Sequence, residues 1–382
     1  MHTSSVSTPH QRLASLDALR GFDLLMLVAV GPLVLQFVQA VGGDSLQGLA
    51  TLFTHKDWEG FSPWDLIMPL FVFMSGASIP FALSRMKQEK DYRSLTYRLS
   101  KRIALLWIFG MICQGNLLGL DPDRIYFYSN TLQSIALGYL VAALFFMFTG
   151  WRTQLIAAIV MLLVYWAGME FVTVGPYGGG NYTPELNFAE WLDVTVLGRF
   201  RDGAQPNADG QWTFAPWYHY TWIWSSINFG VTALTGMFAG LIAKSTQSSS
   251  RKLGIYFGGG LAMIALGWLW GLQMPVIKTI WTSSMVLVSS GYCFLLMAIF
   301  YYIYDVRHAS FGLHFLKIYG MNSITAYMLT SCINFRCIAH SLFYGTEQYL
   351  SGFYPFLLYF SQVVFIFLLL RYMLHHGIFL KV

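Results

Sequence analysis

The sequence carries little charge. Only 11% of its 382 residues are Asp, Glu, Lys or Arg, and 56% are apolar, whereas soluble domains average roughly 25% charged residues. A water-soluble globule of this length would lack the polar residues to cover its surface. The composition therefore excludes a soluble enzyme, a nucleic-acid-binding protein and a secreted disulfide scaffold. The four cysteines form neither a disulfide framework nor a metal-ligand spacing, so we expect no metal site.

Long apolar runs stand where the charge is missing. A transmembrane helix needs about 20 predominantly apolar residues. Ten segments meet this requirement: 22–41, 63–84, 103–120, 130–149, 153–171, 223–243, 253–272, 280–303, 316–333 and 353–374. The sequence predicts an all-α, polytopic membrane bundle of about ten transmembrane helices, with residues 1–382 forming one domain. The first 17 residues are polar and lead into a full span, so we expect no cleavable signal peptide.

The positions of Lys and Arg predict the orientation. Alternate loops hold 17 of the 23 basic residues, and seven of these lie between Arg85 and Arg102. The positive-inside rule places that set of loops, and both termini, in the cytoplasm. On the opposite face we expect two longer loops, 42–62 and 172–222. The second is rich in Gly, Pro and aromatic residues, and loops of that length are commonly functional.

Ionisable residues within the apolar runs are costly and are therefore functional candidates. Asp17, Arg20 and Asp23 open the first run at i, i+3 and i+6, on one side of a helix. One interpretation is a juxtamembrane anchor in which the Arg20 side chain reaches the inner headgroups. The other is the polar floor of a cavity that admits an anionic cosubstrate from the cytoplasm. The sequence leaves both open.

A second polar cluster precedes the second apolar run. It contains His55, Asp57, Trp58 and Asp65. A neutral imidazole beside a carboxylate accepts protons near pH 7, so His55 is a candidate general base. Asp57 and Asp65 are both candidates to orient it, and the spacing does not choose between them.

Aromatic residues gather in the predicted loop 172–222. They are Trp191, Trp212, Trp217, Tyr218, Tyr220 and Trp222. Aromatics at such a boundary are typical of a membrane-interface belt. The alternative is a platform on which sugar rings stack, and this makes Trp217 and Trp58 candidate acceptor-binding residues.

Several stretches together resemble the transmembrane domain of the heparan-α-glucosaminide N-acetyltransferase family, in its bacterial form. They occur in order from about residue 13 to the C-terminus: Asp17 to Gly21, His55 to Ser78, Leu132-Gln133, Asn181 to Gly198, Pro275 to Trp281 and Gly320 to Tyr327. Three places depart from the family pattern. Gly31 replaces an Asn, Ser134 replaces an Arg, and Trp222 to Ser225 replaces an acidic stretch.

The resemblance implies that an acetyl group moves from cytosolic acetyl-CoA to the amino group of a glucosamine-type sugar or oligosaccharide on the far side of the bilayer. His55 then corresponds to the catalytic residue. The resemblance also implies a homodimer in a bacterial inner (cytoplasmic) membrane. On charge alone, four basic residues are candidates to hold the CoA phosphates: Arg20, Arg98, Lys101 and Arg102. Asn322 and Ser323 are candidate donors to a developing oxyanion.

Three alternatives remain open. Transfer is either direct or proceeds through an acetyl-His55 intermediate. Related membrane acyltransferases acetylate hydroxyl groups, but they carry a His early in the first span and residues 22–41 contain none. A transporter or flippase for a glycan or lipid-linked substrate would also account for the buried acidic residues, although transporters often contain internal repeats and we find none.

Overall fold

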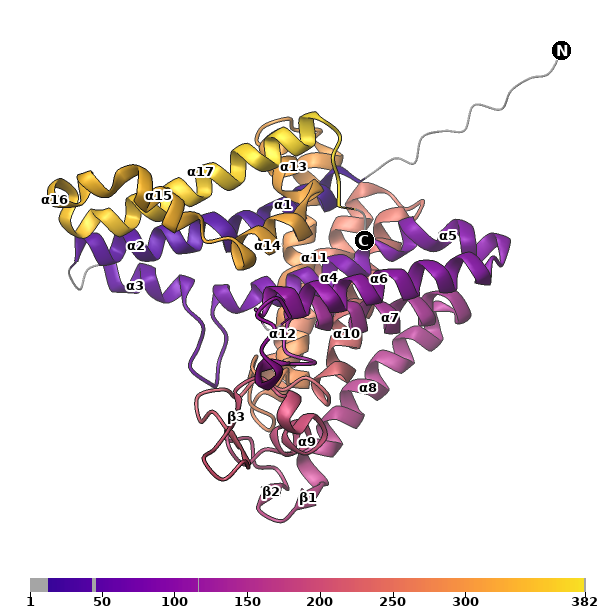
Figure 1. Ribbon diagram of the computed structural model, residues 1–382. Coiled ribbons are helices and arrows are strands. Elements are labelled where there is room, and N and C mark those ends of the chain that lie inside the picture. The colour runs from indigo at the N-terminus through magenta and orange to yellow at the C-terminus, as the bar shows by residue number, and fades with distance from the viewer. Residues whose placement is uncertain (1–12, 43–45, 116, 381–382) are drawn as a thin grey trace.

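The computed structural model describes residues 13–42, 46–115 and 117–380 and is built mainly of helices (Figure 1). In this described part, eight helical segments are long and apolar enough to cross a membrane: Ala14–Val41, Pro63–Glu89, Thr131–Phe148, Trp151–Phe171, Ser225–Lys244, Ser249–Trp270, Ser283–Val306 and Phe335–His375. The prediction of an integral, multi-pass, helical membrane protein is confirmed. The terminal residues 1–12 and 381–382 lie outside the described residues, so the orientation of the ends stays a prediction.

Some of these segments are composite. The first joins α1 (Ala14–Leu25), a π-helical turn η1 (Met26–Val30) and α2 (Gly31–Val41). The second joins η4 (Pro63–Leu66), α4 (Ile67–Ala77) and α5 (Ile79–Glu89). The next single helices are α7 (Thr131–Phe148), α8 (Trp151–Phe171), α10 (Ser225–Lys244) and α11 (Ser249–Trp270). The last two segments contain α12 (Ser283–Phe300), η7 (Tyr301–Val306), α15 (Phe335–Phe343), η8 (Tyr344–Thr346), α16 (Glu347–Leu350), η9 (Ser351–Phe353) and α17 (Tyr354–His375).

Two of the ten predicted spans do not qualify as long apolar helices. The predicted span 103–120 falls on α6 (Tyr92–Cys113), whose first half is polar and basic and which ends earlier than expected. The predicted span 316–333 is divided into α13 (Leu313–Met321) and α14 (Ser323–Cys332). Between them Asn322 has φ −122° and ψ 38°, outside the helical range. The count of ten is therefore not confirmed.

The connections form small elements of their own. Before the second span lie α3 (Gln47–Ala50) and η3 (Thr51–Phe53), and η5 (Pro122–Arg124) follows α6. The predicted loop 172–222 contains β1 (Thr173–Val174), β2 (Tyr177–Gly178), α9 (Phe188–Leu197), η6 (Gly198–Phe200), β3 (Ala204–Pro206) and β4 (Trp212–Phe214). The strands form two antiparallel hairpins, β1–β2 and β3–β4. Figure 1 shows β1, β2, β3 and α9 together at one end of the bundle, while α2, α15 and α17 lie side by side at its flank.

The helices of the core approach each other closely at glycines. A β-carbon on Gly76 of α4 would lie 1.9 Å from the Ala233 carbonyl oxygen of α10, and one on Gly236 of α10 would lie 1.9 Å from the Phe73 carbonyl oxygen of α4. The two backbones are thus in direct contact, as small residues permit between membrane helices. Helix α10, which also packs on α7, α8 and α12, is the centre of the bundle.

Replacement of Gly236 by valine is expected to destabilise the bundle, because a side chain there meets backbone atoms that cannot rotate away. Overpacking of this kind costs about 1–3 kcal/mol or more. The midpoint of thermal unfolding in detergent measures it. Gly254→Val is the control, because no atom lies within 4 Å of its β-carbon position, and an equal loss in both variants would contradict the close α4–α10 contact.

Candidate active site

The carboxylate at the start of the second span is fixed by its own turn. Ser62 precedes η4 and Asp65 is the third residue after it, which is the spacing of a capping box. Asp65 Oδ2 accepts hydrogen bonds from the Ser62 backbone N–H (2.9 Å) and from Ser62 Oγ (3.0 Å). The Asp65 side chain is 2% exposed. Its second oxygen, Oδ1, can therefore form a hydrogen bond with another group.

That group is His55. Its Nδ1 lies 2.7 Å from Asp65 Oδ1, with the imidazole 45% exposed. A hydrogen bond from Nδ1–H to the carboxylate fixes the tautomer and leaves Nε2 with its lone pair. This geometry answers the question that the spacing left open. Asp65 contacts His55, whereas Asp57 is exposed and makes no hydrogen bond or ion pair within the described chain.

Lys278 completes the cluster. It lies in the turn between α11 and α12, and its Nζ is 3.1 Å from His55 Nδ1, 3.3 Å from His55 Nε2 and 3.9 Å from Asp65 Oδ1. Its side chain is 10% exposed. Burial lowers the pKa of Lys278 to about 8, although the charge of Asp65 opposes the shift. A carboxylate, an imidazole and an amine that titrates near neutrality therefore meet at one point.

The cluster opens into a cavity of about 300 Å³, here called the His55 cavity. Its wall combines polar and aromatic side chains: Leu27, His55, Trp64, Ile67, Met68, Phe71, Gln114, Ser129, Asn130, Thr131, Tyr218, Tyr220, Trp222, Lys278 and Tyr327. Such a wall suits a ligand with both apolar faces and hydrogen-bonding groups.

A second cavity, of about 600 Å³, is here called the Arg20 cavity. It is lined by α1, the α4–α5 junction, α6, α7, α13, α14 and the C-terminal segment, and it includes Arg20, Arg102, Asn322 and Ser323. Both side-chain polar atoms of Asn322 are buried without a hydrogen-bond partner. Buried polar groups are rarely left unsatisfied, so Asn322 indicates a place for a polar ligand.

The two cavities share three lining residues, Phe71, Thr131 and Tyr327, which are here called the neck. Along the first span, Arg20 lines one cavity and Leu27 the other. Along α4 the His55 cavity comes before the Arg20 cavity, and along α6 the Arg20 cavity comes first again. This is expected for helices that alternate in direction. The cavities therefore follow one another along the same helices, with the neck residues between them.

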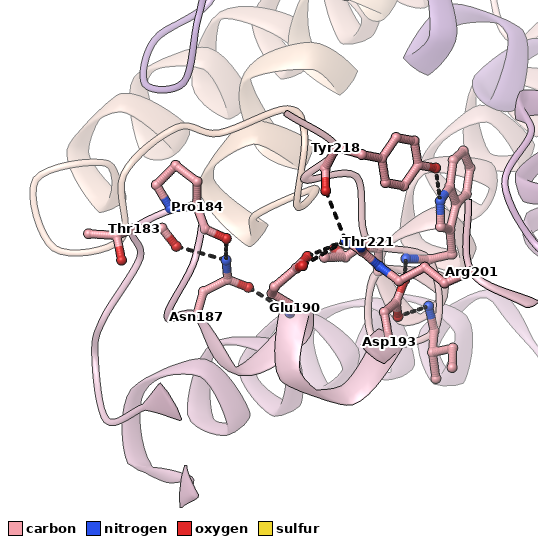
Figure 2. A network of polar contacts seen from close by, with 11 residues as sticks. Thr183, Pro184, Asn187, Glu190, Asp193, Arg201, Tyr218 and Thr221 are labelled. Atoms are coloured by element: carbon pink, nitrogen blue, oxygen red, sulfur yellow. Dashed lines mark hydrogen bonds and ion pairs between the residues drawn. The ribbon is translucent and has the colours of Figure 1, made fainter. Parts of the chain in front are cut away.

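A buried network supports one wall of the His55 cavity (Figure 2). Arg201 Nη2 donates to both Glu190 oxygens (2.7 and 2.6 Å) and to the Tyr218 carbonyl (3.0 Å). Asp193 accepts from the backbone N–H groups of Trp222 (2.7 Å) and Ile223 (3.0 Å). These bonds anchor the segment 218–222 and so position the aromatic side chains of the wall.

The network is formed by carboxylates in an unusual environment. Burial raises the pKa of Glu190 to about 7, against the opposing effect of Arg201. Burial likewise raises the pKa of Asp193 to about 7, against the two backbone hydrogen bonds that favour its charged form. The loop structure around the cavity thus depends on groups that titrate near neutral pH.

The remaining predicted residues are divided between cavity and surface. Arg20 and Arg102 line the Arg20 cavity, and the Arg102 guanidinium lies 4.0 Å from the centre of the Tyr139 ring. Arg98 and Lys101 are exposed and are not part of its lining. Trp58 donates to the Tyr182 carbonyl (2.9 Å), and Trp217 is 73% exposed. Neither tryptophan lines the His55 cavity.

Gly31 has a clear structural role. A β-carbon at this position would lie 1.9 Å from an atom of the Trp64 ring. Trp64 in turn lines the His55 cavity, with its ring centre 6.5 Å from that of His55. The glycine that replaces the family's Asn therefore makes room for an aromatic wall beside the imidazole.

Together these features define a class of protein: a polytopic membrane protein with an acid–base cluster in the wall of one of two adjacent cavities. Residues 12–176 match the family model "Heparan-alpha-glucosaminide N-acetyltransferase, catalytic". The human protein named heparan-alpha-glucosaminide N-acetyltransferase is 26% identical over 367 residues, which cover 83% of this chain and 52% of that protein. The mouse protein of the same name is 25% identical over 366 residues, 83% of this chain and 53% of that protein.

The resemblance that the motifs predicted is thus confirmed by both kinds of comparison. The chain spans about half the length of the curated relatives it matches. Both relatives are named as N-acetyltransferases.

Proposed function

We propose that the protein transfers an acetyl group from acetyl-CoA, bound in the Arg20 cavity, to the amino group of a glucosamine-type sugar in the His55 cavity. The observation that carries this proposal is the pair of cavities that share the neck residues, one of them lined by His55, because two adjacent cavities allow two substrates to react without sharing an entrance. The relatives named as N-acetyltransferases supply the reaction class. The donor enters from the cytoplasm and the acceptor from the opposite face, as the distribution of basic residues predicts.

The Arg20 cavity suits the donor for chemical reasons. Guanidinium groups form strong, charge-assisted hydrogen bonds with phosphate oxygens, and both Arg20 and Arg102 line this cavity. The unpaired amide of Asn322 and the unpaired hydroxyl of Thr325 match the amide groups of a pantetheine arm. Asn322 and Ser323 also remain candidates to donate to the oxyanion that develops on the thioester carbonyl.

In the reaction, the amine nitrogen of the acceptor bonds to the thioester carbonyl carbon, the C–S bond breaks, and the thiolate leaves. His55 Nε2 accepts a proton from the attacking amine, and Asp65 holds the imidazole by its Nδ1–H and stabilises its charged form. This step is direct transfer. In the alternative, the lone pair of His55 Nε2 attacks the thioester and the thiolate leaves, and the acceptor amine then displaces the imidazole, which takes the amine proton. The protein acts as a homodimer in the cytoplasmic membrane in this proposal.

The test is acetyl transfer by the purified protein in lipid nanodiscs, with radiolabelled acetyl-CoA and glucosamine. N-acetylglucosamine is the expected product. Label that stays on the protein when glucosamine is omitted supports the intermediate. Label transferred to hydroxyl groups, when the amine is blocked, supports O-acetylation instead. A protein that neither binds CoA nor hydrolyses acetyl-CoA contradicts the proposal and favours a transporter.

Replacement of Arg102 by alanine is expected to raise the KM for acetyl-CoA about tenfold and to change kcat little, because a phosphate contact of about 1.5 kcal/mol is lost from the ground state and the transition state alike. Steady-state kinetics with varied acetyl-CoA measure the effect. Arg98→Ala and Lys101→Ala are matched controls, since both side chains lie outside the cavity. A similar rise in these controls would indicate a diffuse charge effect at the membrane surface.

A further inference from the structure

Lys278 occupies an unusual position. Its ammonium or amine group is nearly buried, it lies 3.3 Å from His55 Nε2, and it forms part of the wall of the His55 cavity. The nearest carboxylate oxygen, on Asp65, is 3.9 Å away and is already bonded to His55. Lys278 is thus not a simple ion-pair partner of Asp65. Its nitrogen lies within 3.3 Å of both ring nitrogens of the proposed base, and both residues line the same cavity.

Amide formation from an ammonium ion requires a second proton acceptor, and Lys278 is placed to be one. An amino sugar arrives as an ammonium ion and leaves as a neutral amide, so its nitrogen gives up two protons. One of them ends on the sulfur of the departing thiol, and the other is released to solvent. A single imidazole holds only one proton at a time. A second proton acceptor in the same cavity allows both deprotonations without exchange of water in between.

We propose that Lys278 is a second catalytic base, which takes the first proton from the ammonium of the acceptor and so produces the free amine that attacks the thioester. This inference rests on the proposed function. The neutral Lys278 amine receives this proton, and His55 Nε2 receives the second as the C–N bond forms. The His55 proton passes to the thiolate sulfur, and Lys278 returns its proton to the solvent that reaches the half-exposed imidazole.

The surroundings of Lys278 allow it to be neutral. The titratable groups that face it are His55 and Asp65 from the segment before α4, and Tyr220, whose ring centre is 5.8 Å from Nζ. Its own turn, residues 275–282, contains no other titratable side chain. Glu59 pairs with Ile277 through the backbone only and is exposed. A pKa near 8, caused by burial, makes the neutral amine available at physiological pH.

The first test compares wild type, Lys278→Met and Lys278→Arg in acetyl transfer between about pH 6 and pH 9. Arginine keeps the positive charge but does not lose a proton in this range. Both variants are expected to lose about 10–100-fold in kcat at the alkaline end. The ratio of wild-type to methionine-variant kcat is expected to fall about tenfold per pH unit below pH 8, since protonation removes the function of Lys278 only in wild type.

Lys56→Met is the matched control. It removes a basic residue next to His55 in sequence whose side chain is exposed, and it is expected to keep the wild-type profile. Full activity of Lys278→Arg would overturn the proposal, because it would mean that Lys278 contributes only its positive charge. A ratio that does not change with pH would overturn it as well.

A second measurement does not depend on transfer. The rate at which an amine-reactive ester labels Lys278, followed by mass spectrometry, reports the fraction of neutral amine. A midpoint near pH 8 supports the proposal, and a midpoint above about pH 10, the ordinary range for lysine, overturns it. A labelling midpoint near pH 8 in a protein that transfers no acetyl group would contradict the proposed function alone. Acetyl transfer by a protein whose Lys278 has a midpoint above about pH 10 would contradict this inference alone.

Discussion

Replacement of His55 by alanine is expected to lower the rate of acetyl transfer by about 10²–10⁴-fold, the range that a general base contributes. The imidazole lines the cavity assigned to the acceptor, and its Nδ1 is held by Asp65 at 2.7 Å. Loss of the ring leaves the cavities in place, so the KM for acetyl-CoA is expected to change little. Steady-state kinetics in nanodiscs measure both quantities.

A matched control for His55 is His340→Ala. His340 lies on α15, where its Nδ1 is 2.7 Å from the Tyr354 hydroxyl, and it lines neither cavity. This variant tests whether the loss of a histidine outside the cavities lowers the rate by destabilising the protein. Undiminished transfer by the His55 variant would end the catalytic assignment. Equal losses in both variants would point to folding instead.

Replacement of Asp65 by asparagine is expected to lower kcat by about 10²–10⁴-fold with little change in shape. An amide NH₂ opposite His55 favours the tautomer with a bare Nδ1, which places the hydrogen on Nε2 and removes the lone pair that accepts the proton. The loss resembles the cost of a misplaced tautomer in other histidine-dependent transferases and hydrolases. The amide oxygen can still accept from the Ser62 N–H, so the turn is expected to form.

Asp57→Asn is the matched control for Asp65, because it makes the same chemical change in the same loop on an exposed side chain. We expect it to retain wild-type kinetics. Thermal unfolding of both variants separates loss of chemistry from loss of fold. A large effect at Asp57 with none at Asp65 would mean that the imidazole is oriented differently during catalysis.

The sequence predicted the helices better than their continuity. Eight of the ten spans predicted from apolar length are long apolar helices in the structure, because the cost of exposing backbone in lipid imposes about 20 apolar residues on each span. Apolar length could not reveal the break at Asn322, since a polar residue between two apolar stretches is compatible with a continuous helix. Apolar length also could not show where α6 begins, because basic residues occur both at the end of a membrane helix and in the loop that precedes it.

The candidate site shows the same division. Asp17 and Arg20 could be placed on one helix side by periodicity, and the structure puts both in a cavity wall. The contact of His55 with Asp65 depends on a turn three residues long and could not be distinguished from one with Asp57. Arg98, Lys101 and Arg102 are close in sequence, but only Arg102 faces the cavity. The number of basic residues in a segment does not show which of their side chains face the cavity.

Lys278 was not recognised as a site residue. It is separated from His55 by 223 positions and follows an apolar span by a few residues, where a lysine is ordinarily at the interface. One signal was present: the stretch Pro275 to Trp281 matches the family motifs, and it contains a single ionisable residue. A lysine that is the single ionisable residue of such a motif is worth testing as a functional group.

The neck at Phe71, Thr131 and Tyr327 has an electrical consequence. In the proposed function the two cavities open to opposite sides of the membrane, and the membrane potential then falls mainly across the few residues between them. Moving one elementary charge through such a field costs about 2.3 kcal/mol per 100 mV. In the proposed transfer an uncharged acetyl group crosses without this work, while the anionic donor and cationic acceptor each stay on their own side.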